Sequence, residues 1–275
     1  MLIKNHQPIG VFDSGVGGFT VLKVLAKHFP DENFLYLGDS ARLPYGTKSP
    51  LTIRKYGEQA LNFLADAGVK SIIIACNSAS SQFRETEFRG IPVENVIDPG
   101  AATALRITQG RIGILGTRAT INSKVYEQTL LKLAQEQNRN IEIFSAAAPL
   151  LVPLAEEGWI DDPITNLIVF RHTQELLQQK IDTLILGCTH YPILRASIQK
   201  AVGNSMNLVD SGEALAEILR KKFDNQTLKR REATAADSEP RRIEILSTEE
   251  SANFTAMAQR MIGEHGITSI KLVDL

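Results

Sequence analysis

The sequence predicts an α/β protein made of two similar parallel-sheet lobes, pseudo-symmetric and Rossmann-like, with the active site in the cleft between them. Short apolar runs alternate with longer amphipathic stretches, which is the pattern of parallel strands joined by helices. The segments IGVFDS at Ile9 and IGILGT at Ile112 are alike and lie 103 residues apart, and the two cysteines, Cys76 and Cys188, lie 112 residues apart. These offsets favour two related halves, although strand-plus-helix patterns also recur by chance.

The expected strands are short, apolar and often followed by glycine or polar residues, as buried parallel strands are. They lie at 9–12, 34–37, 71–75, 93–97, 111–115, 141–144, 182–186, 207–209 and 243–246. The stretches expected to be helices have apolar residues at helical spacing. They lie at 19–28, 51–67, 121–137, 163–179, 212–222 and 251–262.

The order of these elements predicts two domains, one of them discontinuous. The chain has 275 residues, 43% of them hydrophobic, which is enough for a substantial core. Residues 1–98 and 210–275 are expected to form the first lobe and residues 99–209 the second. The charged and polar stretch 225–242 is expected to be an exposed loop, and its short basic cluster lacks the interleaved aromatic residues of a nucleic-acid site.

Composition excludes several classes of protein. With 30 basic and 31 acidic residues the net charge is −1, so no strong field favours nucleic acid or an anionic membrane. The N-terminus lacks the apolar stretch of a secretory signal, and no run approaches the roughly 20 apolar residues of a membrane span. A cytoplasmic location is therefore expected, with both cysteines as free thiols. Without a C-x-x-C motif or a dense His/Cys cluster, no metal site is expected.

The two cysteines are the main candidates for chemistry, because each follows an apolar run, in ACNS around Cys76 and GCTH around Cys188. A single such cysteine is more often a buried structural thiol. Two thiols on opposite faces of one substrate carbon, however, could remove a proton from one face and return it to the other. A thiol has an unperturbed pKa of about 8.5, so it needs a helix N-terminus or a nearby donor, and His190 could be that donor for Cys188.

The loop DSGVGG at 13–18 lies between an expected strand and an expected helix. Its glycines let backbone amides approach a ligand, and the helix N-terminus suits a carboxylate or phosphate. The G-x-G-x-x-G pattern is absent, which disfavours nicotinamide binding. Asp13 could bind an amino group or orient a proton donor, but Asp13 or Ser14 could equally be a helix cap in a tight turn.

Three further stretches offer polar groups at the ends of expected strands. Tyr45 supplies a hydroxyl in the loop 38–46, where such loops converge on one rim of a sheet. Thr117 and Thr120 could bind a ligand or cap a helix. Glu156 and Glu157 fall in a loop-like stretch at 152–158, where paired glutamates are usually solvated surface.

Six motifs follow one another along the chain: FDSGVGG (12–18), GDSARLPYG (38–46), ACNSAS (75–80), GTRAT (116–120), PLAEEG (153–158) and GCTHYP (187–192). In this order they resemble the cofactor-independent glutamate racemases of the aspartate/glutamate racemase superfamily. The resemblance implies interconversion of L- and D-glutamate without pyridoxal phosphate or metal, for bacterial peptidoglycan synthesis. It implies that Cys76 acts on the D enantiomer and Cys188 on the L enantiomer.

The resemblance also implies which residues support the two thiols. Asp13 would assist Cys76 and His190 would assist Cys188, while one of Glu156 and Glu157 would join the second thiol, with the choice left open. The residues expected to bind the carboxylates and the ammonium group of the substrate are Asp13, Ser14, Tyr45, Gly46, Asn77, Ser78, Thr117, Thr120 and Thr189.

The chain departs from the family pattern at a few places. Ser78 stands where the family commonly has threonine, which keeps the hydroxyl, and Ala148 stands where a further, non-catalytic cysteine is common. The segment 225–242 is longer than the family needs, and we assign it no function. A homodimer is expected, because dimers are common in the family.

Three other readings stay open at this point. A racemase for another acidic amino acid, such as aspartate, would need only a different pocket shape. A non-catalytic binding or regulatory protein on the same fold, with a partner such as a topoisomerase, is disfavoured because both cysteines and their helpers are present. A thiol hydrolase built on Cys188 and His190 would leave Cys76 without a purpose.

Overall fold

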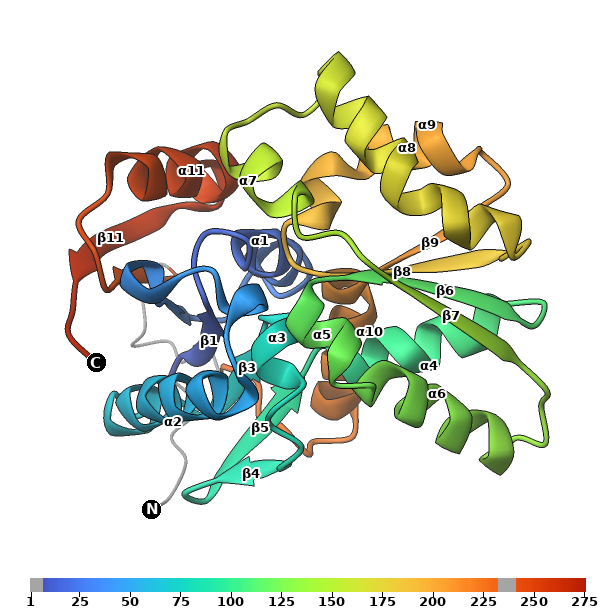
Figure 1. Cartoon of the computed structure of the whole chain (residues 1–275). Coiled ribbons are helices and arrows are strands. Elements are labelled where there is room, and N and C mark those ends of the chain that lie inside the picture. The colour runs from blue at the N-terminus through green and yellow to red at the C-terminus, as the bar shows by residue number, and fades with distance from the viewer. Residues whose placement is uncertain (1–6, 232–240) are drawn as a thin grey trace.

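The computed structural model describes residues 7–231 and 241–275, which form two α/β lobes around two sheets (Figure 1). The predicted fold class is thereby confirmed. Residues 1–6 and 232–240, which include half of the charged segment, lie outside the described part.

The first lobe contains a seven-stranded sheet in the order β11-β10-β2-β1-β3-β5-β4. Its strands are β1 (Ile9–Asp13), β2 (Phe34–Gly38), β3 (Ser71–Ile74), β4 (Glu87–Phe88), β5 (Ile91–Asn95), β10 (Ile243–Ser247) and β11 (Ile267–Leu272). All neighbouring pairs are parallel except β4 with β5. Every residue of β1, β2 and β3 is buried, so these strands read as continuous apolar runs.

The second lobe contains a four-stranded parallel sheet in the order β7-β6-β8-β9. Its strands are β6 (Arg111–Gly116), β7 (Glu142–Ala147), β8 (Thr183–Gly187) and β9 (Asn207–Asp210). The order β7-β6-β8-β9 repeats the order β2-β1-β3-β5 of the first sheet. This shared order supports the interpretation of two related halves, while the residue boundaries proposed for the two domains stay a prediction.

Helices cover both faces of each sheet. They are α1 (Phe19–His28), α2 (Pro50–Asp66), α3 (Asn77–Ser80), α4 (Ile97–Ile107), α5 (Arg118–Asn122), α6 (Val125–Glu136), α7 (Leu151–Glu156), α8 (Pro163–Gln178), α9 (Arg195–Val202), α10 (Ser211–Asp224) and α11 (Ala252–Ile262). The described residues also form the short 3₁₀ turns η1 (Ser40–Arg42), η2 (Tyr45–Thr47), η3 (Tyr191–Leu194) and η4 (Gly263–His265). No helix in the described ranges is long and apolar enough to cross a membrane.

Successive residues of one strand serve opposite cores, as the pleat requires. Val11 packs with α1, α10 and α11, whereas Phe12 packs with α2 on the other face. The C-terminal elements β10 and α11 therefore complete the first lobe, although they follow the whole second lobe in the chain (Figure 1).

Two predicted elements are wrong in their extent. The helix expected at 121–137 is two helices, α5 and α6, because Lys124 adopts a left-handed backbone conformation with φ of 59°. The strand expected at 93–97 ends at Asn95, whose side-chain oxygen accepts hydrogen bonds from the amides of Ile97 and Asp98 and starts α4.

Other parts of the chain are more ordered than predicted. The stretch expected to be loop-like around Glu156 is helix α7, and the elements α3, α4, α9, β4 and β11 were not predicted. The segment 225–242 was expected to be an exposed loop, but backbone groups in its first half are held by hydrogen bonds to buried side chains. Buried Glu32 accepts a hydrogen bond from the amide of Arg231 at 2.9 Å, and buried Lys70 donates one to the carbonyl of Lys229 at 2.9 Å.

Candidate active site

Most of the predicted site residues meet at the carboxyl ends of the central strands of both sheets. In each sheet the chain order reverses at the centre, between β1 and β3 and between β6 and β8, and ligands of α/β proteins bind at such switch points. Several hydrogen bonds join the lobes here, among them Thr189 Oγ1 to Asp13 Oδ1 at 3.2 Å, Ser78 Oγ with Thr117 Oγ1 at 2.9 Å, and Tyr126 OH to Asn77 Oδ1 at 2.8 Å.

Cys76 follows β3 and is the N-cap residue of α3, with 5% of its surface exposed. Its thiol donates to Ser14 Oγ at 3.6 Å, and its sulfur accepts a hydrogen bond from the amide of Ala79 at 3.5 Å. Burial, followed by the negative charge of Asp13, raises the pKa of Cys76 to about 12. The free protein therefore holds a proton on this sulfur at neutral pH.

Asp13 ends β1 and is fully buried. Its carboxylate accepts hydrogen bonds from the amide of Gly15 at 2.9 Å and from Thr189 Oγ1 at 3.2 Å. Burial raises the pKa of Asp13, and the nearby His190 partly opposes that rise. Both partners of this carboxylate are therefore polar groups of the site.

The glycines after Asp13 bring the two lobes together. A Cβ atom on Gly18 would lie 2.4 Å from Asp13 Cβ, and one on Gly17 would lie 2.4 Å from His190 Nδ1. No side chain fits at either position without displacing a site residue. The glycine-rich loop thus owes its composition to close packing against the site.

Cys188 follows β8, is 6% exposed, and lies beside His190 with Sγ and Nδ1 3.8 Å apart. The other ring nitrogen of His190 hydrogen-bonds Glu156 Oε1 at 2.9 Å. Burial alone would lower the pKa of His190, but the hydrogen bonds and charges of Cys188 and Glu156 outweigh it and raise the pKa to about 10. At neutral pH the neighbour of Cys188 is therefore an imidazolium.

Helix α7 separates the two glutamates between which the sequence left the choice open. Glu156 is its last residue and reaches His190, whereas Glu157 is exposed and follows the helix. Successive residues of a helix point about 100° apart, so only one of two neighbours can face the site. The geometry brings Glu156, and not Glu157, to the second thiol.

A cluster of three hydroxyl groups lies on the side of the site that carries Cys76. Thr117 Oγ1 lies 3.0 Å from Thr120 Oγ1, and Ser78 Oγ lies 3.5 Å from Thr120 Oγ1. Gly46 packs against this cluster, because a Cβ atom there would lie 2.6 Å from Thr117 Cβ. All three hydroxyls are buried and come from both lobes.

Asn77 presents a donor that no described residue uses. Its Oδ1 accepts from Tyr126, but its buried Nδ2 has no hydrogen-bond partner in the described part of the chain. A buried donor without a partner costs about 1–3 kcal/mol, so such a group commonly awaits a ligand. Sequence reasoning missed Tyr126, which lies in a helix outside the six motifs.

Tyr45 is fully buried, and its hydroxyl donates a short hydrogen bond to Asp39 Oδ2. Asp39 also accepts from Arg42 at 2.7 Å and from Thr248 at 3.0 Å. Tyr45 is therefore held by a network that fixes the loop after β2. Asp39 is a further residue that sequence reasoning did not single out, although it lies in the motif at 38–46.

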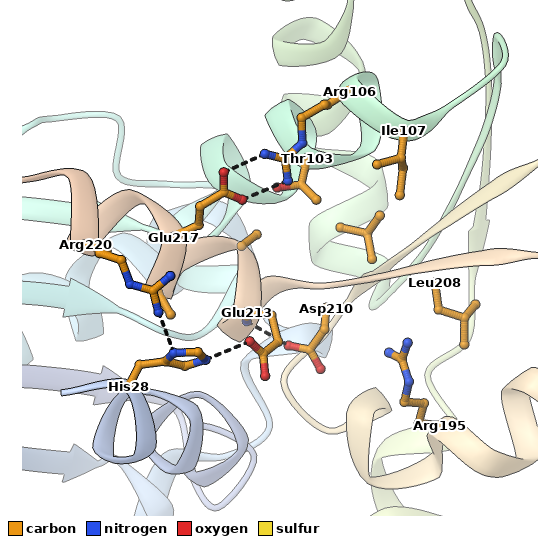
Figure 2. Close-up of a pocket in the computed structure, with 13 residues that line it drawn as sticks. His28, Thr103, Arg106, Ile107, Arg195, Leu208, Asp210, Glu213, Glu217 and Arg220 are labelled. Atoms are coloured by element: carbon orange, nitrogen blue, oxygen red, sulfur yellow. Dashed lines mark hydrogen bonds and ion pairs between the residues drawn. The ribbon is translucent and has the colours of Figure 1, made fainter. Parts of the chain in front are cut away.

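Figure 2 shows a cavity of about 600 Å³ that is not part of this site. It lies where α10 packs on α1 and α4, and none of the predicted site residues lines it. Several of its charged groups bind one another: Arg106 pairs with Glu217, and His28 lies between Glu213 and Arg220. In the described ranges no group of three or more His, Cys, Asp or Glu residues could hold a metal ion.

The arrangement brings two thiols from different lobes to one place, with a carboxylate beside one and an imidazolium beside the other. They are near enough for the charge of Cys188 to be among the causes that raise the pKa of Cys76. Such a pair can transfer protons at two faces of one carbon, and the polar groups around it can hold an amino acid.

Comparisons with known proteins agree with this chemistry. The family model described as Asp/Glu/Hydantoin racemase matches residues 20–219. A glutamate racemase from Syntrophus aciditrophicus is 42% identical over 97% of this chain and 97% of its own length. Among solved structures, a glutamate racemase from Bacillus anthracis has a TM-score of 0.88 at 33% identity and covers 99% of both chains. A glutamate racemase from Francisella tularensis in complex with D-glutamate has a TM-score of 0.86 at 33% identity and covers 98% of both.

Proposed function

The chain belongs to the Asp/Glu/Hydantoin racemase family and has glutamate racemase activity, and from this premise we propose that Cys76 and Cys188 exchange the α-proton of glutamate. The observation that carries the proposal is the meeting of two buried thiols from two lobes, each with its own ionisable helper. An enzyme of this kind is an isomerase and needs an acid and a base on opposite faces of the substrate.

In the L to D direction, the thiolate of Cys188 removes the α-proton. The C–H bond breaks, an S–H bond forms, and the electron pair passes into the α-carboxylate group of the substrate. The thiol of Cys76 then donates its proton to the opposite face of the same carbon. In the D to L direction the roles reverse.

In the L to D direction the two thiols start in different protonation states, and their helpers differ accordingly. His190, held as an imidazolium by Glu156, stabilises the thiolate of Cys188. Burial, and after it the charge of Asp13, raises the pKa of Cys76 and keeps the proton on its sulfur. We assign Glu156 to the positioning of His190 and leave Glu157 outside the site.

The remaining polar groups hold the substrate. The hydroxyls of Ser78, Thr117 and Thr120, together with the free Nδ2 of Asn77, supply hydrogen-bond donors for carboxylate oxygens. Asp13, Ser14 and Thr189 lie beside the thiols, where oxygen atoms accept hydrogen bonds from an ammonium group. Tyr45 and Gly46 shape the wall of the site.

The biological role that follows from the family is the supply of D-glutamate for peptidoglycan. We place the protein in the cytoplasm, because the mechanism requires both thiols reduced.

We also propose a homodimer. Helix α8 carries exposed Ile164, Leu167 and Phe170 at spacings of three residues, and an apolar stripe of this kind favours association. Light scattering of the purified protein tests the dimer.

The test of the activity is proton NMR with L-glutamate in D₂O and no added cofactor. Loss of the α-proton signal together with D-glutamate in chiral chromatography is the expected result. Exchange with aspartate but not with glutamate would assign aspartate as the substrate. No exchange with either would favour a non-catalytic binding protein on this fold.

A further inference from the structure

A second cavity adjoins the hydroxyl cluster from outside. It has a volume of about 270 Å³ and lies between η2 of the first lobe and α5 of the second. Gly46 lines it, and so do Arg118 and Ala119, which lie between the two threonines of the cluster in the sequence. The remaining lining residues are Thr47, Lys48, Pro50, Ile53, Gln82, Asn122 and Ser123.

This cavity is positively charged. Lys48 and Arg118 both line it, and none of its lining residues is acidic. Arg118 is exposed, and Lys48 is half-buried with its ammonium group 5.9 Å from the ring centre of Tyr56. His172 lies nearby, but burial, with Arg171 and Arg118, lowers its pKa and leaves it neutral. The local field is therefore positive although the whole chain carries a charge of −1.

The reacting groups are closed off from solvent, because Cys76 and Cys188 are only 5% and 6% exposed. Glutamate carries two carboxylates and one ammonium group, so it reaches the thiols as a net anion. A passage next to the site with cations on its wall and no carboxylate would raise the local concentration of such a substrate. The cavity in Figure 2 is unsuitable, because Asp210, Glu213 and Glu217 line it as well.

We propose that the cavity between η2 and α5 is the vestibule through which glutamate reaches the thiols, and that Lys48 and Arg118 draw the anion into it. Because its walls come from different lobes, a small separation of η2 from α5 opens it toward the hydroxyl cluster. Lys48 and Arg118 are positioning residues, since they act on the approach of the substrate and not on its α-carbon. This inference rests on the proposed function.

The direct test compares two alkylating reagents of similar size, anionic iodoacetate and neutral iodoacetamide. In each, a thiolate displaces iodide and a sulfur–carbon bond forms, and mass spectrometry follows labelling of Cys76 and Cys188. In the double variant Lys48→Gln/Arg118→Gln, the ratio of the iodoacetate rate to the iodoacetamide rate should fall about threefold to tenfold at low ionic strength. The difference from the wild type should shrink in about 0.5 M salt, where charges are screened over a few Å.

The matched control is Lys132→Gln/Lys200→Gln, which removes the same charge from exposed positions outside the cavity. Its ratio should equal that of the wild type. An unchanged ratio in the first variant, or an equal fall in both, would overturn the vestibule.

Kinetics give a second readout. In the double variant at Lys48 and Arg118, kcat/KM should fall by a similar factor while kcat stays within about twofold, and Arg118→Lys should recover most of the loss. A large fall in kcat with unchanged kcat/KM would contradict a role in approach. A wild-type protein without racemase activity would instead refute the proposed function, and the alkylation ratios would still test the vestibule.

Discussion

The two halves of the active site have the same architecture and opposite electrostatics. Cys76 follows β3 and Cys188 follows β8, and these strands occupy equivalent places in the two sheets. Burial and the nearby carboxylate of Asp13 raise the pKa of Cys76 to about 12, whereas Cys188 lies beside His190, whose own pKa rises to about 10. The fold supplies the symmetry that a racemase needs, and the helper residues give the two thiols opposite charges as neighbours.

This difference indicates the protonation state of the two thiols in the free enzyme. A protonated Cys76 opposite a Cys188 paired with imidazolium is ready for L-glutamate. After one turnover to D-glutamate the proton has moved from Cys76 to Cys188, so the enzyme waits in the reverse state. Asp13 and His190 are then the groups best placed to restore the first state, because each lies beside one thiol.

The largest expected effect on racemisation comes from replacing either catalytic cysteine. Cys76→Ser and Cys188→Ser should each reduce racemisation by about 10²- to 10⁴-fold, since an alcohol is a far weaker acid than a thiol. Chiral chromatography measures the activity, and circular dichroism should show an unchanged fold. Normal racemisation by either variant would rule out the two-thiol scheme.

The next largest effect is expected at Asp13, the residue that assists Cys76. Asp13→Asn removes the negative charge that helps to raise the pKa of Cys76, so the pKa of that thiol should fall. The rate of Cys76 alkylation against pH, measured in the Cys188→Ser background, gives this pKa. Racemisation should still fall, by about tenfold or more, because Asp13 also binds Thr189 across the lobes. A rise in the pKa of Cys76 would contradict the assignment.

On the second half, neighbouring glutamates provide a matched pair of variants. Glu156→Gln should lower the pKa of His190 below about 10 and reduce kcat/KM about tenfold, whereas Glu157→Gln should change both only slightly. The titration of His190 by NMR measures the pKa. Equal effects of the two changes would show that α7 does not select between the glutamates.

The raised pKa of His190 also predicts how stability depends on pH. The folded-state pKa of about 10 exceeds the unfolded value of about 6.5, so this contribution is fully present below pH 6.5 and is lost as pH rises through 10. Denaturant unfolding between pH 6 and 10 should show a steeper loss for the wild type than for Glu156→Gln. Parallel curves would mean that the pair does not stabilise the fold.

The smallest effect concerns the hydroxyl cluster. Ser78→Thr keeps the hydroxyl and should leave kcat/KM within about threefold, whereas Ser78→Ala removes a hydrogen-bond partner of Thr117. That loss corresponds to about 1 kcal/mol, or roughly fivefold in KM. Steady-state kinetics of the two variants measure the difference, and a larger loss with threonine than with alanine would point to steric limits at this position.

Much of the fold could be predicted because apolar runs mark buried parallel strands directly. The nine predicted strands overlap β1 to β3 and β5 to β10. The signal is strongest for β1, β2, β3 and β8, which are buried along their whole length and therefore lack polar alternation. Helix α4 was not predicted, because Asp98, Pro99 and Gly100 in its first turn look like a turn. The side chain of Asn95 accepts the hydrogen bond that lets the helix begin there. The break at Lys124 has no strong signal either, because lysine rarely adopts a positive φ.

The site was predictable only in part. Strand ends gather at one edge of a sheet, so the candidate residues could be placed together, and the six motifs supplied the roles that we propose for them. Contacts between lobes, such as Thr189 with Asp13, depend on how two sheets face each other, which no local pattern encodes. Likewise Tyr126 reaches Asn77 from a helix with ordinary amphipathic spacing.

The central claim is that each thiol serves one enantiomer, and the most direct measurement is α-proton exchange of single enantiomers in D₂O by the two cysteine variants. Cys76→Ser should still exchange the α-proton of L-glutamate without forming D-glutamate, because Cys188 remains to remove and return it. Cys188→Ser should exchange only D-glutamate. Exchange of both enantiomers by one variant, or the opposite pairing, would contradict the account.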